Sequence, residues 1–229
     1  MPVTSVTKLF SKKPASSTSA RRICTEDELM DTRTGLLIVL IVGGLWSGWH
    51  RWTLRAVHQP DGEIAPHEPV QTDIDTIAKA RLGRWTLTPR ATYDIEARIL
   101  SREDYRFDAL ASLVPEDLAL GWGPMSDNRI LVDFDISQSV RFYTWHPRTA
   151  LPIPREVVIS HSANTHVIPA DSHIREQLSR LRVGEVVRLT GLLVDAVRDD
   201  GARVHTSLTR TDSGAGACEV MLVEQVDVR

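Results

Sequence analysis

Cysteine is scarce in this chain, and most of the sequence motifs that announce a known chemistry are absent. Only two of the 229 residues are cysteine, Cys24 and Cys218, so there is no CxxC pair for zinc or redox chemistry. There is also no HExxH, no acidic calcium loop, no P-loop and no dinucleotide fingerprint. The sequence therefore predicts no metal site and no cofactor.

Neither sign of charge is in large excess. The chain has 27 basic and 30 acidic residues, and without the 6 basic and 4 acidic residues before position 50 it has 21 and 26, a net charge of −5. Binding along a nucleic-acid backbone depends on clustered Lys and Arg and on the counterions that they release. We therefore expect no nucleic-acid partner.

One long uncharged run stands out, GLLIVLIVGGLWSGW at residues 35–49. As a helix these residues reach about 22 Å, less than the roughly 30 Å hydrocarbon core of a bilayer. Extension to Leu54 gives about twenty residues, with Trp46, Trp49 and Trp52 at one end, where indole rings favour the membrane boundary. The pattern predicts a transmembrane helix over residues 35–54, with the lipid bilayer as a partner.

Three other interpretations of this run fit less well. A cleaved signal peptide has a short basic head and small residues before the cut, whereas this head is 34 residues long and the run ends in tryptophans. A buried helix of a globular domain rarely lacks polar residues on every face. An interfacial helix shows a charged stripe, which is missing here.

The flanks of the run predict an uncleaved signal anchor. Basic residues are slightly more frequent before the run than after it, and a large folded part follows a short polar head. We expect residues 1–34 to be a disordered cytoplasmic head and the C-terminal part to be extracytoplasmic, periplasmic in a Gram-negative bacterium. Cys24 and Cys218 then lie on opposite sides of the membrane. Gly44 and Gly48 form a GxxxG pattern that predicts a homodimer contact between two such helices.

The remainder divides into a tether and one domain. Residues 55–84 contain several prolines, and over 72–82 they have apolar residues at helical spacing, which predict a short amphipathic helix. Residues 85–229 suffice for one core. In this domain Gly191 suggests a bend or bulge, and Asp199-Asp200-Gly201 suggests a hairpin turn. The expected strands are 93–100, 129–134, 140–145, 156–160, 185–197, 203–210 and 219–228, and the expected short helices are 115–120 and 172–182.

Strands with one or two short helices predict a β-rich α+β fold, and within it a small, partly open β-barrel of OB type. An architecture of this kind carries no function by itself.

Several polar and aromatic residues are candidates for a site. The weak catalytic candidates are His166, His205, Asp212 and Glu219. The binding candidates are Trp122, Trp145, His146, Asn164 and Arg210. For each there is a structural alternative: His161, His166 and His173 can be hydrogen-bonded loop histidines, the Gly-rich segment after Arg210 can be a capped hairpin loop, and Trp122 can be a core residue.

Three hypotheses about function follow from these observations. The first, which the sequence favours, is a single-pass envelope protein whose extracytoplasmic domain is a non-catalytic binding or assembly module for another envelope protein. The second is a membrane-tethered hydrolase with a His/Asp/Glu pocket. The third is a carrier of a metal or cofactor.

Overall fold

The computed structural model describes residues 34–45, 48, 55–75, 78–214 and 216–229, and the chain divides into two compact units, Met1–Trp49 and His50–Arg229. In the first unit, residues 34–45 form a helix whose side chains are all exposed. Among the described residues no helix combines the length and hydrophobicity that a membrane crossing requires. The predicted head with Cys24 and the Trp-rich end of the predicted span lie outside the described residues.

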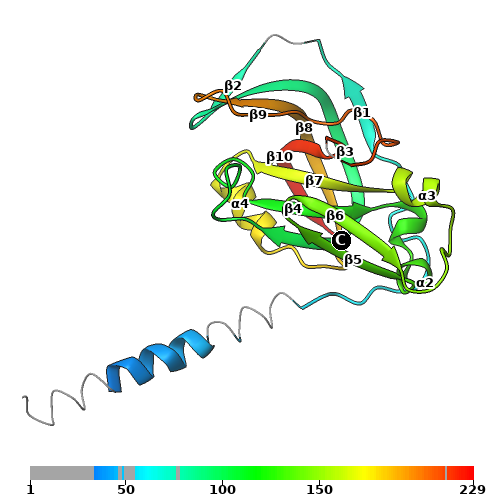
Figure 1. The fold of residues 1–229 in the computed structure, drawn as a ribbon, viewed down its shortest axis with the longest axis horizontal. Coiled ribbons are helices and arrows are strands. Elements are labelled where there is room, and N and C mark those ends of the chain that lie inside the picture. Colours follow the sequence, from blue (N-terminus) through cyan, green and yellow to red (C-terminus); the bar gives the residue numbers. More distant parts are fainter. Residues whose placement is uncertain (1–33, 46–47, 49–54, 76–77, 215) are drawn as a thin grey trace, which may run out of the picture. The chain divides into compact units, whose positions relative to one another are not determined.

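The second unit is organised around a ring of five strands (Figure 1). Each strand pairs with the next along the ring, and the last pairs with the first. All pairings are antiparallel except β7–β10, which is parallel. In ring order the strands are β3 (Trp85–Asp104), β4 (Glu116–Gly121), β7 (Ser162–Pro169), β10 (Glu219–Val228) and β8 (Val186–Arg198).

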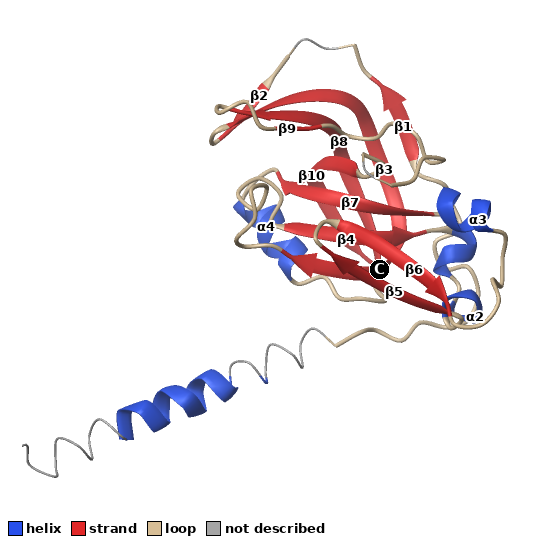
Figure 2. Cartoon of the chain, in the orientation of Figure 1, coloured by secondary structure: helices blue, strands red, loops and turns tan. Residues whose placement is uncertain are grey.

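Shorter elements extend or cover this ring (Figure 2). The strands β1 (Val70–Asp73) and β2 (Ala80–Leu82) pair with β3, and β9 (Arg203–Val204) pairs with β8. A separate two-stranded sheet consists of β5 (Phe134–Ser139) and β6 (Phe142–Pro147). The helices are η1 (Gly123–Ser126), α2 (Asn128–Leu131), α3 (Arg155–Ser160) and α4 (Ser172–Ser179). The predicted β-rich α+β class is confirmed.

Successive side chains of each ring strand point alternately to an inner and an outer face of the sheet. Ile95, Leu189 and Met221, on three different strands, are fully buried in the largest apolar cluster. Gly191 lies where β8 and β10 approach most closely, because a Cβ atom there would be 2.0 Å from the Leu222 carbonyl oxygen. The register between these strands shifts beside Gly191, between Val223 and Gln225 of β10. The predicted irregularity is therefore confirmed, although the extra residue is on the partner strand.

The predicted secondary structure is correct for the long C-terminal strands and wrong for several short segments. Strands near 93–100, 185–197 and 219–228, the helix at 172–182 and the turn at Gly201 are confirmed. The expected strands at 129–134 and 156–160 are wrong, since these segments are mainly the helices α2 and α3. The Asp127 side chain caps α2, so local capping outweighs the apolar content of that segment. The helix α3 begins after Pro154 without a side-chain cap.

Two expected helices are also wrong. Residues 115–120 do not begin a helix at Pro115 but form β4, whose residues are all buried. Burial on both faces removes the alternation that marks a strand. Over 72–82 the described residues include β1 and β2, which are edge strands with exposed side chains. The expected strand at 203–210 is confirmed only at Arg203 and Val204.

Candidate functional site

Three neighbouring ring strands bring a carboxylate, an imidazole and a thiol to the same outer face. Asp117 of β4 lies directly opposite His166 of β7 in the strand register. Along the other edge of β7, His166 pairs with Val220 of β10. Cys218 immediately precedes β10 and lies two residues before Val220, so its side chain points to the same face of the sheet. The cluster of Asp117, His166 and Cys218 is called the thiol centre below.

The imidazole of His166 interacts with both of its neighbours. Its Nδ1 atom lies 2.8 Å from Asp117 Oδ1, close enough for an ion pair although not aligned for a full hydrogen bond. Burial by itself lowers the pKa of His166, but the interactions with Asp117 and with the Cys218 thiol outweigh it and raise that pKa to about 9. The ring is therefore a cation at neutral pH, and it lies beside the Cys218 thiol.

Cys218 is a free, half-buried cysteine that is held by Asn164. The Asn164 side-chain amide donates to Cys218 Sγ at 3.4 Å and to the Arg141 carbonyl at 3.1 Å. Its oxygen accepts a hydrogen bond of 2.7 Å from Gln138. Because Gln138 fixes the orientation of this amide, one of its N–H groups remains directed toward the thiol and the other toward the Arg141 carbonyl.

The hairpin between β5 and β6 fixes the carboxylate. Its turn consists of Val140 and Arg141, the two described non-glycine residues with positive φ, at 51° and 69°. Arg141 donates to Asp117 Oδ1 at 2.8 Å, binds Asp108 through two further hydrogen bonds and stacks 3.6 Å from the Tyr105 ring centroid. Strained backbone persists where the surrounding contacts determine it, and it concentrates at functional sites.

A pocket of about 130 Å³ opens beside the thiol. Aromatic side chains of β6 form one wall, and the Gly-rich segment before β10 forms another. The lining residues are Phe142, Tyr143, Trp145, Ile159, Ser162, Ala163, Asn164, Asp212, Ser213, Gly214, Ala217 and Cys218. A small acyl group or one side chain of a larger substrate therefore has space next to Cys218.

The inner face of the same strands carries polar groups of a different kind. Thr165 and Glu219 are paired in the β7–β10 register and face the ring interior near Tyr93. Each of these three side chains has a buried oxygen without a hydrogen-bond partner among the described residues. Burial raises the pKa of Glu219 to about 8 and also raises the pKa of Tyr93. Glu219 is therefore a neutral acid at neutral pH.

The structure brings some of the predicted site residues together. His166 belongs to the thiol centre, and Asn164 donates to its cysteine. Trp145 and Asp212 line the adjoining pocket. Asp212 also accepts a 2.7 Å hydrogen bond from Ser207. Glu219 is close in sequence, but it faces the ring interior.

Other predicted site residues lie elsewhere. Trp122 is fully buried in the largest apolar cluster, so it is a core residue. His205 is exposed and lies 3.5 Å from Asp195, and His146 is exposed on β6. Arg210 donates to the Pro69 carbonyl at 2.9 Å. Among the described residues no group of three or more His, Cys, Asp or Glu side chains has the arrangement of a metal site.

Sequence reasoning missed Asp117, Arg141 and the role of Cys218. Asp117 is a charged residue within a buried strand. Because an unpaired buried charge is costly, its position indicates that another side chain neutralises it. Arg141 gives no such signal, because nothing local indicates positive φ at a Val-Arg pair.

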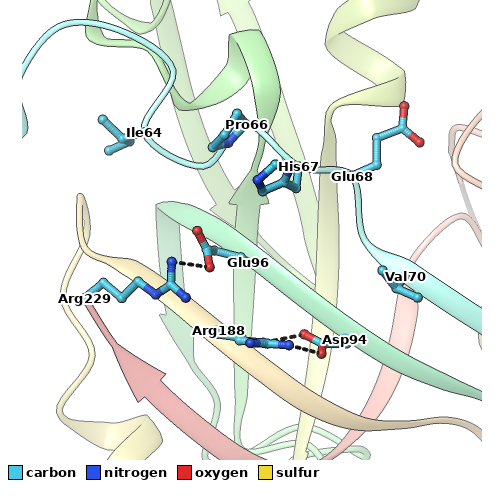
Figure 3. A pocket seen from close by; sticks show the side chains of 9 residues that line it. All are labelled: Ile64, Pro66, His67, Glu68, Val70, Asp94, Glu96, Arg188 and Arg229. Atoms are coloured by element: carbon cyan, nitrogen blue, oxygen red, sulfur yellow. Dashed lines mark hydrogen bonds and ion pairs between the residues drawn. The ribbon is translucent and has the colours of Figure 1, made fainter.

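A larger cleft lies away from the thiol centre, between the tether and the outer sheet face (Figure 3). Its volume is about 600 Å³. Its two arginines are neutralised, because Arg188 binds Asp94 through two hydrogen bonds and Arg229 binds Glu96 at 2.7 Å. The cleft therefore has no unpaired arginine for an anion, and Glu68 lines it without an ion pair among the described residues.

Comparisons of the chain with protein-family models, with curated proteins and with solved structures gave no match. The functional argument therefore depends on the geometry of the site itself.

Proposed function

We propose that the protein is a membrane-anchored, thiol-dependent acyl-transfer enzyme that acts as a hydrolase. The observation that carries this proposal is the contact of His166 with both Asp117 and Cys218 on one sheet face, beside an open pocket. Nucleophile, base and orienting carboxylate in this order are the parts that covalent acyl transfer requires.

Each residue has a defined role in the proposed reaction. The Cys218 thiolate attacks the acyl carbonyl, and protonated His166 gives its proton to the leaving group, which leaves a thioester. Neutral His166 then takes a proton from water, the hydroxide attacks the thioester, and the proton returns to the departing thiolate. Asp117 orients the ring and stabilises its charged form, and the Asn164 amide donates to the developing oxyanion.

Thiol reactivity and acyl-enzyme formation test this proposal in the full chain carrying Cys24→Ser. We expect Cys218 to form a thioester with a p-nitrophenyl ester and to react with iodoacetamide at pH 7 faster than it does in the urea-unfolded chain. Loss of the general acid/base in His166→Asn should slow acylation about 100-fold. His205→Asn is the matched control, because His205 is exposed outside the site. Slower alkylation in the folded chain than in the unfolded chain would overturn the proposal.

The scaffold of this site is, in this proposal, a partly open β-barrel of OB type. The cyclic pairing order of β3, β4, β7, β10 and β8 supports it, as does the position of α4 between β7 and β8. An experimental structure in which β3 and β8 separate along their whole length would contradict it.

The proposed location of the enzyme follows from the apolar run. Residues 35–54 form the signal anchor, the N-terminus is cytoplasmic, and the thiol centre is extracytoplasmic. Labelling of intact cells with a membrane-impermeant maleimide tests this topology. We expect Cys24 to be protected until the cells are lysed, and labelling of Cys24 from outside would invert the orientation.

A second candidate function is the binding of another envelope protein, and one observation favours it. Val140 and Phe142, at the tip of the β5–β6 hairpin, are 77% and 50% exposed. Exposed apolar side chains at a hairpin tip are suited to contact a partner. Co-purification with Cys218→Ala tests this function, since a binding module keeps its partner without the thiol and loses it in Phe142→Ser.

The anchor helix offers a homodimer contact as part of either function. The space around Gly44 and Gly48 is open on the described helix, so a second helix can approach closely. Gly44→Leu should reduce crosslinking of the full chain in membranes, and Gly43→Leu is the control on a neighbouring face.

A further inference from the structure

A second groove, on the outer face of β3, contains a buried arginine without an ionic partner. Arg98 is 8% exposed, and its hydrogen bond to a described residue is the 3.0 Å contact to the Ser126 carbonyl. Within the described part of the chain no carboxylate is within 4.0 Å of the guanidinium. Burial lowers the pKa of Arg98, while the charge of Asp127 opposes this.

The nearest acidic group is already neutralised. Asp127 accepts hydrogen bonds of 3.0 and 2.7 Å from the Arg129 side chain and bonds of 2.9 Å from two backbone amides, at Gly62 and Arg129. A carboxylate with these partners has little charge left for Arg98. An uncompensated buried cation is costly, so an anion that reaches Arg98 gains a strong interaction.

The groove around Arg98 is large and its lining is mixed, with His58, Asp135 and Arg148 beside apolar residues. Its volume is about 460 Å³, within the range of small-molecule sites. Arg148 and Asp135 lie at its rim and bind each other at 2.6 Å, so Arg98 is the unpaired charge. The apolar lining consists of Ala56, Val57, Ile99, Leu100, Leu131, Phe134, Ile136 and Val183.

One wall of the groove is the chain that follows the apolar run. The Val57 amide donates to the Val183 carbonyl at 2.7 Å, and Gly184, with φ of 90°, leaves room for Val57, whose carbonyl oxygen would be 2.0 Å from a Cβ atom there. The segment is thus docked on the domain. In the sequence, Ala56 follows the predicted span by only two residues.

We propose that this groove binds a long-chain carboxylate, with the acyl chain along the apolar walls and the carboxylate on Arg98. The buried cation sets the class of ligand, because a partly apolar groove with one buried arginine that has no ion pair fits an amphipathic anion. The site is separate from the thiol centre, and the inference does not depend on the proposed catalysis.

Binding of radiolabelled dodecanoate to the full chain in an uncharged detergent tests the proposal. We expect one bound dodecanoate per chain, at least tenfold weaker binding in Arg98→Met, and an intermediate value in Arg98→Lys. Arg188→Met is the matched control, because it removes an arginine from the cleft in which that charge is paired. Dodecanol, which has the same chain without the charge, should compete at least tenfold less well than unlabelled dodecanoate.

Two further measurements check that the variant folds and that the bound anion needs its acyl chain. The melting temperature of Arg98→Met should equal or exceed that of the wild type, because an unpaired buried charge is removed. If this variant does not fold, Leu131→Trp fills the groove while Arg98 stays in place, and it should lose dodecanoate. Wild-type affinity in these variants, or equal competition by dodecanol, overturns the proposal. Competition by inorganic phosphate as strong as that by dodecanoate also overturns it and indicates a bare anion site.

Discussion

The two faces of β7 and β10 carry polar groups under opposite conditions. On the outer face, His166 and Cys218 have charged or polar partners, and Cys218 borders a pocket. On the inner face, Thr165 and Glu219 are sealed in the ring and retain oxygens without partners among the described residues. One residue of displacement along a strand separates these two environments.

The comparison shows how one pair of strands keeps an ionised site and a neutral interior side by side. The outer face stabilises a charged imidazole through Asp117, while the inner face raises the pKa of Glu219 to about 8 through burial. On the outer face the charged imidazole of His166 is buried, and Cys218 beside it borders the pocket. Chemistry is therefore expected on the outside of the ring, and the inner groups affect stability.

The largest expected effect is the loss of the outer carboxylate. Asp117→Ala leaves Arg141 and His166 buried without their common partner, and we expect the free energy of unfolding to fall by about 3–5 kcal/mol. Urea unfolding of the full chain measures this change. Asp135→Ala, which breaks an exposed pair with Arg148, should cost at most about 1 kcal/mol. Equal losses of unfolding free energy in the two variants would show that Asp117 stabilises the fold no more than an exposed ion pair does.

The pH dependence of stability tests the inner carboxyl group. The unfolded chain ionises Glu219 near its ordinary pKa of 4.5, whereas the folded chain keeps it protonated up to about 8. The contribution of this group to stability is therefore present below pH 4.5 and declines as the pH rises to 8.

Glu219→Gln, which does not titrate, isolates this contribution. Relative to the wild type, the variant should gain about 2–4 kcal/mol between pH 4.5 and 8 in urea unfolding. Glu116→Gln should show a comparable gain, because burial raises the pKa of Glu116 to about 8 although Arg102, 2.8 Å away, opposes the shift. A constant difference between wild type and Glu219→Gln across this range would show that Glu219 ionises normally.

A smaller effect is expected from the inner hydroxyl. Thr165 is fully buried and its Oγ1 atom has no partner among the described residues, so Thr165→Val replaces an unpaired polar group with an apolar one of the same shape. We expect thermal unfolding to show a stabilisation of about 1 kcal/mol. Asn164→Leu, on the adjacent outer position, should destabilise the protein, because Gln138 and Arg141 lose a partner.

The smallest expected effect concerns the strained turn above the outer face. Val140 has φ of 51°, which costs a β-branched residue free energy, and its side chain is exposed. Val140→Gly should stabilise the protein by about 1 kcal/mol in thermal unfolding, while the alkylation rate of Cys218 stays unchanged. Arg141→Lys, which keeps the charge but loses the forked contacts, should change that rate. A destabilised Val140→Gly would refute the assigned strain.

The comparison also shows why the sequence predicted part of this arrangement. The long C-terminal strands alternate clearly, so β8, β10 and their turn could be predicted, and His166, Asn164 and Asp212 were identified as polar residues in unusual segments. Asp117 could not be predicted, because its strand is buried on both faces and shows no alternation. Its partners Arg141 and His166 also come from distant parts of the chain. The groove around Arg98 was also invisible, since its walls come from the tether, β3 and the β5 region.

The parallel pairing of β7 with β10 has a consequence for the order of assembly during synthesis. Of the five ring strands, β10 leaves the ribosome last, and it must enter between β7 and β8, which are already made. Cys218 arrives with this strand, so the thiol meets His166 only when the ring closes. A nascent or incompletely folded domain therefore lacks the assembled thiol centre, which is completed in the last step of ring formation.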